Sequence, residues 1–467
     1  MPFLDILVFI IYLALVLGIG FYFYRKNQNT QDYYVGGRDM KSFHVGLSVV
    51  ATDVGGGFSI GLGGLGFVMG ISGSWMLFTG LIGAWLSAVF LIPKVIHKGH
   101  KLRLLTFPQL LKENYGVTVA FVAGVISFIG YLGFTSSQLL AGAKLAVGTF
   151  PALNLLDALY LMGAVAIVYT VFGGIKAVIY TDTFQWSILI IGLIFVGIPF
   201  AYFKLGGWDA IQSVLPNKFF SLTNLRWVQF ANWFITIVPI WFVGMTLYQR
   251  IYACKDEKTA KKAWYIAGLF EWPVMAFMGI ALGLLARVGA EQGLFIADGF
   301  AQAATMDPEI GLPLLLKNIL PAGLLGLMMA AYFSAIMSTA DSCLLASSGN
   351  FVTDILNLKE DNPRAILISQ VATFVIGFAA ILIASYMTSV LDLMLLSYAF
   401  MVSGLLVPVL GMLWSKKKKP LAALLAMLFG GFSTLILTFL SVEIPFGFDP
   451  ILIGILISLF LYLIVKK

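Results

Sequence analysis

VVATDVGGGFSIG (residues 49–61) combines features that are unusual for a membrane-spanning helix. The stretch lies within a long apolar segment, yet it carries the carboxylate of Asp53, followed by the glycine triplet Gly55 to Gly57. An ionised aspartate is costly in hydrocarbon, and each glycine weakens a helix by about 1 kcal/mol relative to alanine. A close helix–helix packing face would explain the glycines alone. The full combination predicts a helix that is interrupted at membrane depth and faces an internal cavity.

The composition of the whole chain indicates an integral membrane protein. Of its 467 residues, 60% are hydrophobic and 11% are charged, and the mean hydropathy is +0.96. A soluble domain carries about 25% charged residues, so this chain has too few charges to cover a surface that faces water. The net charge of +7 does not indicate a nucleic-acid partner, because the basic residues lie in short loops between apolar runs. We expect the lipid bilayer to be the surroundings of the chain.

Apolar runs of about 20 residues, long enough to cross a bilayer, recur along the chain. We predict thirteen such runs: 3–24, 42–70, 73–95, 118–148, 151–172, 177–204, 226–248, 262–289, 320–352, 364–387, 390–414, 420–441 and 448–465. Of the 29 Lys and Arg residues, 23 fall in the loops after odd-numbered runs, at the run ends that border these loops, or at the C-terminus. This asymmetry predicts an N-terminus outside and a C-terminus in the cytoplasm. The external stretch 290–319 is predicted to carry a short helix around 310–318.

A second polar stretch at membrane depth is AAYFSAIMSTADSCLLASSGN (residues 330–350). Ala335, Ser338, Thr339 and Ser342 recur at helical spacing and share one face, with Asp341 beside them. Hydroxyls within a helix often bond to the backbone of their own helix, and this is the simpler explanation for the presence of these serine and threonine residues. A stripe of hydroxyl oxygens next to a carboxylate also suits a small hard cation, especially opposite the carbonyls of a broken helix.

A third polar stretch is VFGGIKAVIYTDTFQ (residues 171–185), in which Asp182 lies inside an apolar run. A helix-capping role is possible for this carboxylate, but a cation or a polar partner is the better explanation. The cysteines, Cys254 and Cys343, do not form the framework of a disulfide-rich fold. The histidines lack the spacing of a metal site, and no nucleophile–base arrangement is visible, so an enzyme is not expected.

Together, several motifs of this sequence resemble the sodium/solute symporter family, whose members carry proline, pantothenate, sugars, sialic acid or choline. The matching motifs are YYVGGRDM (33–40), ATDVGGG (51–57), GGIKAVIYTDTFQ (173–185), YQRIYACKD (248–256) and AIMSTADS (335–342). The resemblance implies that residues 1–467 form one all-α transporter domain with thirteen transmembrane helices.

The domain organisation that the resemblance implies is a pair of inverted five-helix repeats. The first repeat would span residues 42–204 and the second residues 226–414, with an extra N-terminal helix at 3–24 and two C-terminal helices at 420–465. The first helix of each repeat is broken near the midplane. In the second repeat, Pro239 and Gly244 suit such a break.

The resemblance also implies which residues bind sodium, the expected cofactor. The main site would be formed by backbone carbonyls at the first break and by carbonyl and hydroxyl oxygens of the ninth run, namely Ala51, Val54, Ala335, Ser338 and Thr339. Some members have a second site between the sixth and ninth runs, which matches Asp182, Ser338, Asp341 and Ser342. Asp53 occupies the position at which proline carriers have an aspartate important for sodium coupling.

The solute is expected to bind at the two breaks. The candidate residues are Thr52, Asp53, Gly55, Gly56, Tyr131, Gln138, Trp241 and Gly244, and the aromatic residues Phe134 and Trp233 are further candidates unless they merely pack. Amides at the glycine-rich break could bind a carboxylate, whereas Asp53 and aromatic rings could bind an ammonium group. An amino acid or a related zwitterion or carboxylate is therefore favoured over choline or a sugar. Choline carriers typically have an aromatic residue at the position of Asp53, and sugar carriers have a polar residue at that of Gly244.

The function that follows is secondary active transport of a small solute by alternating access, driven by sodium. A channel would need a continuous pore, and saturable, gradient-dependent uptake would argue against it. A sensor would need an appended soluble domain, and no obligatory protein partner is indicated. The compact size and short loops favour the inner membrane of a bacterium.

Overall fold

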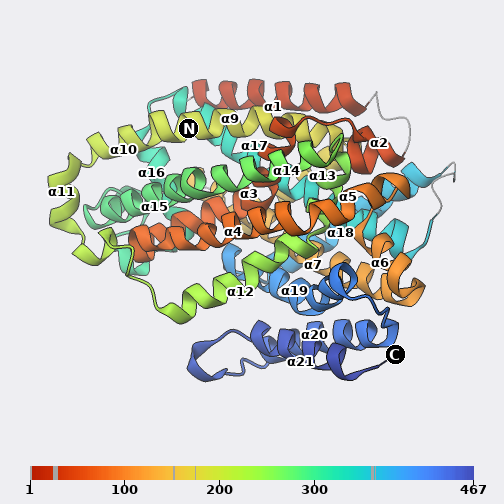
Figure 1. The fold of residues 1–467 in the computed structure, drawn as a ribbon. Coiled ribbons are helices and arrows are strands. Elements are labelled where there is room, and N and C mark those ends of the chain that lie inside the picture. Colours follow the sequence, from red (N-terminus) through yellow and green to blue (C-terminus); the bar gives the residue numbers. More distant parts are fainter. Residues whose placement is uncertain are drawn as a thin grey trace.

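The computed structural model describes residues 3–24, 30–150, 153–173, 175–358, 362 and 364–466. Within these ranges the chain is helical, and its one β-bridge joins Met40 and Cys254. Long helices run side by side through a single bundle, and α20 and α21 form a hairpin along one edge of it (Figure 1). The predicted all-α fold is confirmed.

The helices that build the bundle are listed here with their bounds. The long ones are α1 (Phe3–Tyr24), α3 (Ser42–Met69), α4 (Trp75–Phe90), α7 (Val117–Thr149), α8 (Leu155–Gly173), α9 (Ile175–Gly192), α12 (Trp227–Val243), α14 (Glu257–Leu269), α15 (Ala276–Glu291), α17 (Leu324–Gly349), α18 (Ala365–Ser385), α19 (Val390–Trp414), α20 (Pro420–Phe439) and α21 (Ile451–Ile464). The short ones are α2 (Thr30–Val35), α5 (Ile92–Lys101), α6 (Phe107–Tyr115), α10 (Ile198–Lys204), α11 (Gly207–Val214), α13 (Met245–Ala253) and α16 (Pro308–Ile319).

Each of the predicted apolar runs coincides with helical structure in the described residues. Among the described residues, eight helices are long and apolar enough to cross a membrane, and the count is nine if the bent pair α12 and α13 forms one span. Three further apolar helices are shorter, so the count of thirteen spans, like the repeat boundaries, stays a prediction. Residues 151 and 152 of the expected runs, and residue 174 of the motif 173–185, lie outside the described ranges. The short helix expected around 310–318 is confirmed as α16.

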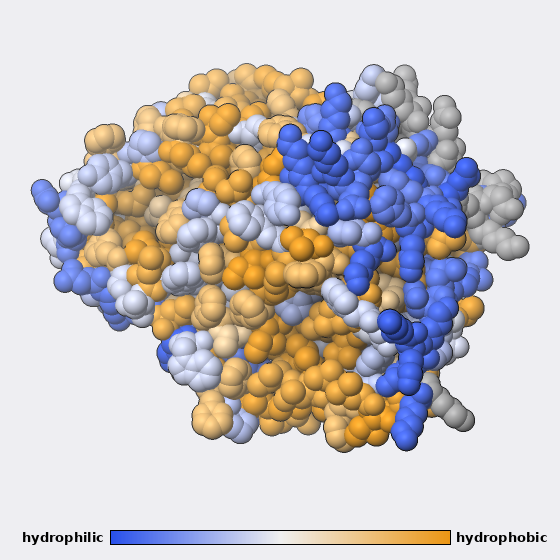
Figure 2. All heavy atoms as spheres, in the orientation of Figure 1, coloured by the Kyte–Doolittle hydropathy of each residue, from blue (hydrophilic) through white to orange (hydrophobic). Residues whose placement is uncertain are grey.

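The outer surface has the polarity of a protein that sits in a bilayer. A broad hydrophobic belt covers the middle of the molecule, and hydrophilic residues gather at its two ends (Figure 2). The larger hydrophilic cap covers the end at which α5, α6 and the C-terminus lie (Figure 1). Large apolar side chains such as Phe195 and Phe203 are more than 70% exposed in the isolated chain, which is favourable only against lipid. The predicted integral membrane character is therefore confirmed.

Helix α17 is the axis around which the candidate site is built. Nearly all of its side chains are buried, although it carries many hydroxyl groups and Asp341. It packs against α1, α3, α7 and α9. Burial of so polar a helix requires partners from its neighbours, and the most polar part of α3 supplies several of them.

Candidate functional site

Helix α3 is broken at Gly55, inside the stretch that the sequence singled out. Gly55 has φ 52° and ψ −175°, a conformation that is essentially restricted to glycine. A second break lies at Gly244, where α12 and α13 meet at an angle of 43°. Both interruptions were predicted from the sequence, and the structure confirms them.

The break in α3 lies directly against the hydroxyl face of α17. The Oγ1 of Thr339 donates to the carbonyl of Ala51 at 3.0 Å and lies 3.2 Å from the carbonyl of Ala335. Ser338 donates to the same Ala335 carbonyl at 3.1 Å. The structure thus brings together four of the five residues predicted for the main sodium site, and the fifth, Val54, is buried immediately before the break. These carbonyl and hydroxyl oxygens are the donor set that fits a hard cation.

A residue that the sequence analysis missed, Arg250 of α13, occupies the space beside this cluster. Its guanidinium group is fully buried and donates to Ser48 at 3.0 Å, to Thr52 at 2.5 Å and to Ser342 at 2.9 Å. It also forms an ion pair with Asp182 at 3.6 Å. The predicted run 226–248 had placed Arg250 in the following cytoplasmic loop, which was wrong. Its hydrophilic character suggested a loop, but buried partners on α3, α9 and α17 keep it inside.

The predicted second sodium site is divided between two sets of contacts. Asp182 accepts a hydrogen bond from Ser48, and it shares Arg250 with Ser342. Asp341 accepts a hydrogen bond from Thr170 of α8 instead. Asp182 and Ser342 thus share one partner, whereas Asp341 has another. The positive charge beside Asp182 is that of Arg250.

The second half of α3 begins in tight contact with other side chains. The amide of Gly57 donates to Oε1 of Gln138 at 2.9 Å. A methyl group on Gly56 would lie 1.8 Å from Ile336, so α17 packs directly on the backbone at this point. The amide that could have bound a solute carboxylate is thus satisfied by the protein itself. Among the predicted solute-binding residues, Thr52, Gly55, Gly56 and Gln138 all contact other parts of the protein here.

Aromatic side chains surround the two breaks. The hydroxyl of Tyr131 contacts Thr246 at 3.0 Å, next to Gly244. The hydroxyl of Tyr398 donates to Oδ1 of Asp53 at 3.3 Å, and the Phe134 ring packs edge-on against that of Tyr398. Tyr398 had no motif that pointed to it. All three rings are buried.

Trp241, a predicted solute-binding residue, is fully buried near the second break. Its ring packs edge-on against that of Trp264 and covers Gly83 of α4, where an added methyl group would lie 2.3 Å away. No hydrogen-bond partner reaches its indole nitrogen within the described part of the chain.

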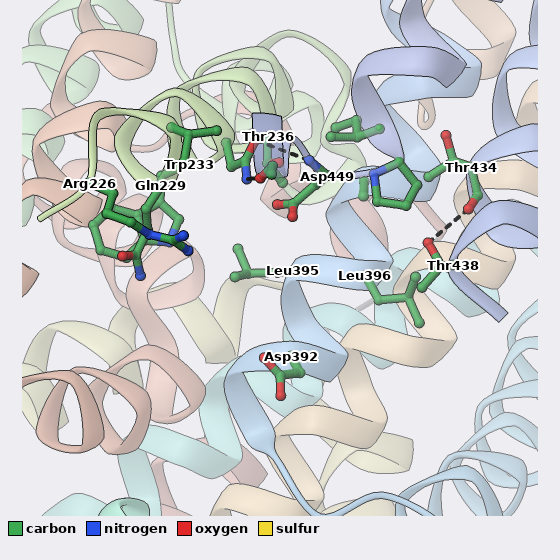
Figure 3. A pocket seen from close by; sticks show the side chains of 16 residues that line it. Arg226, Gln229, Trp233, Thr236, Asp392, Leu395, Leu396, Thr434, Thr438 and Asp449 are labelled. Atoms are coloured by element: carbon green, nitrogen blue, oxygen red, sulfur yellow. Dashed lines mark hydrogen bonds between the residues drawn. The ribbon is translucent and has the colours of Figure 1, made fainter. Parts of the chain in front are cut away.

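A polar cavity of about 430 Å³ opens between α12, α19, α20 and the start of α21 (Figure 3). Trp233 and Thr236 of α12, Asp392 of α19, Arg226 and Asp449 all line it (Figure 3). Trp233, a candidate for the solute site, thus faces this cavity. The cavity lies beside the helices α12 and α19, which also carry Trp241 and Tyr398.

The chain matches a known protein family and two transporters whose solutes are named. A family model described as "Sodium:solute symporter family" matches residues 33–430, which is most of the chain. The osmoregulated proline transporter OpuE of Bacillus subtilis (strain 168) is 27% identical, and the match covers 98% of this chain and 93% of OpuE. The sodium/proline symporter of Staphylococcus aureus (strain JH9) is 27% identical, over 80% of this chain and 74% of that protein.

Solved structures show a similar fold. The substrate-bound, outward-open state of a Na+-coupled sialic acid symporter superimposes with a TM-score of 0.79 at 21% identity, covering 98% of this chain and 97% of that one. MHP1, a nucleobase-cation-symport-1 family transporter in a closed conformation, gives a TM-score of 0.56 at 14% identity, with 92% of each chain covered. At these identities the likeness concerns the fold alone.

Proposed function

Because this chain belongs to the sodium:solute symporter family, we propose that its sodium-coupled symport carries an amino acid or a related zwitterion or carboxylate by alternating access. The family consists of transporters rather than enzymes, and sodium is the coupling ion. The proline transporters among the relatives support an amino acid as the solute. We further propose one transporter domain of two repeats, 42–204 and 226–414, in a bacterial inner membrane with the N-terminus outside.

The observation that carries this proposal is the contact between the break in α3 and the hydroxyl face of α17. Sodium would be held by the carbonyls of Ala51, Val54 and Ala335 and by the hydroxyls of Ser338 and Thr339. The hydrogen bond of 3.0 Å from Thr339 to Ala51 joins two groups that would both turn toward the ion. Sodium would then bridge α3 and α17 directly.

Coupling follows if the bridge between α3 and α17 exists in only one of the two access states. An ion shifts a conformational equilibrium only by its difference in affinity for the two states. A site divided between two helices provides that difference, because relative movement of the helices separates the ligands. The inward movement of each sodium ion also gains about 2.3 kcal/mol per 100 mV of membrane potential.

The residues Asp182, Asp341, Ser338 and Ser342 remain our proposal for a second sodium site. Arg250 lies in ion-pair contact with Asp182, so an ion would bind there only after the guanidinium group withdraws. We therefore propose that this second site is alternately occupied by arginine and by sodium.

Removal of a ligand hydroxyl should weaken sodium binding. We expect Thr339→Ala and Ser338→Ala each to raise the sodium concentration for half-maximal uptake by about 10- to 100-fold, since an interaction with a charged group contributes about 1.5–3 kcal/mol. Uptake of a solute panel that includes proline is measured in proteoliposomes with and without an inward sodium gradient. Ser348→Ala is the matched control, because Ser348 also lies on α17, outside the predicted sodium ligands, and donates to the Leu345 carbonyl of its own helix at 3.3 Å. Unchanged sodium dependence in both test variants would count against the site.

A further inference from the structure

Glu271 is a second buried carboxylate in the region of the solute site. It lies in a π-helical turn (Phe270–Met275) between α14 and α15, and its side chain is fully buried. This turn packs against α3, and the carboxyl group of Glu271 lies next to that of Asp53. Gly80 of α4 makes this placement possible, because a methyl group there would lie 1.6 Å from Oε1 of Glu271.

Three of the four oxygens of the Asp53 and Glu271 carboxyl groups receive no hydrogen bond from another residue of the described ranges. Tyr398 donates to Oδ1 of Asp53, but within the described ranges no donor reaches Oδ2 of Asp53 or either oxygen of Glu271. Two buried bases of the bundle have other partners, since Arg250 pairs with Asp182 and Lys144 binds acidic groups of the stretch 307–309. Adjacent buried carboxylates repel each other unless a cation or a proton lies between them.

We propose that Asp53 and Glu271 together bind the protonated amine of the transported solute. This inference rests on the proposed function and specifies the class of its substrate. The three oxygens without donors match the three N–H groups of a primary ammonium, and a secondary ammonium offers two. A quaternary ammonium or a sugar has no charged N–H group that could donate a hydrogen bond to these oxygens. Hydrogen bonds between an ammonium and carboxylates are about twice as strong as those between neutral groups.

Two further observations favour an amine over a carboxylate as the recognised group. The amide of Gly57 at the start of the second half of α3 is already bonded to Gln138, which removes a donor that an anion would need. The separate polar cavity beside α12 and α19, which neither Asp53 nor Glu271 lines, is lined by the carboxylates of Asp392 and Asp449 and by one base, Arg226 (Figure 3). An excess of negative charge in a concave site attracts cations.

The test uses the full-length purified protein and a minimal pair of probes. Methylammonium and tetramethylammonium carry the same charge, but only the first has N–H donors. In the presence of sodium, methylammonium should raise the unfolding temperature of the wild type, and tetramethylammonium should not. Glu271→Gln should raise the half-saturating methylammonium concentration by about 10- to 100-fold, the range expected for a charged hydrogen bond. Glu271→Asp keeps the charge and should retain most of the effect, and the exposed Glu443→Gln is the control.

Each outcome decides a separate question. Equal stabilisation by both probes, no stabilisation by methylammonium, or an unchanged Glu271→Gln variant would overturn the amine site and leave a carboxyl pair that shares a proton. The sodium site is tested separately, in the absence of any amine. If the site exists, sodium should raise the unfolding temperature of the protein and potassium should not. The absence of this stabilisation would count against the proposed function, whatever the probes do.

Discussion

Arg250→Gln should lower the free energy of unfolding by about 3–5 kcal/mol, because the substitution leaves the buried carboxylate of Asp182 without its cation. The hydroxyls of Ser48, Thr52 and Ser342 also lose their shared donor. The measurement is thermal or denaturant unfolding of the purified protein in detergent. A loss of less than about 1 kcal/mol would mean that the guanidinium group is not a structural partner of Asp182.

A double-mutant cycle separates the ion pair from the general effect of losing a large side chain. Asp182→Asn combined with Arg250→Gln should be less destabilising than the sum of the single variants, because neither charge is then left alone. Lys261→Gln serves as control, since Lys261 pairs with Glu257 on the surface, where an ion pair contributes at most about 1 kcal/mol. If sodium can replace the guanidinium group, added sodium should restore stability to Arg250→Gln more than to the wild type.

Gly55→Ala should disturb both the backbone conformation and the packing at the break of α3. Its φ of 52° costs a residue with a side chain about 1–3 kcal/mol, and overpacking against α17 costs a similar amount, about 2–6 kcal/mol in all. The added methyl group would lie 2.8 Å from Cγ2 of Thr339 and 3.0 Å from its Oγ1. We expect loss of stability together with loss of sodium-dependent uptake, measured by unfolding in detergent and by transport in proteoliposomes.

Gly116→Ala is the matched control for the substitution at Gly55. Gly116 also has a positive φ, 91°, but a methyl group there would meet no atom within 4 Å. It therefore carries the backbone strain without the clash. If the two variants lose equal stability and both keep normal uptake, the contact between Gly55 and Thr339 has no part in sodium binding.

The sequence alone determined the all-helical membrane fold, the break at Gly55 and the hydroxyl face of α17. These features follow from local free energies, because glycine runs and polar groups in hydrocarbon are unfavourable wherever the rest of the chain lies. The spacing of Ser338, Thr339 and Ser342 fixes their common helical face in the same local way. The second break was implied by the family resemblance, and Pro239 and Gly244 suited it.

Only the tertiary structure decided what these groups face. Hydropathy placed Arg250 in a loop, but packing of α13 against α3 and α17 puts its side chain in contact with Asp182 of α9 and Ser342 of α17. Glu271 had no motif, and its meeting with Asp53 depends on the rotation and depth of two helices that are distant in sequence. Pairings of this kind arise from how whole helices pack, so the pattern of residues within one segment does not contain them.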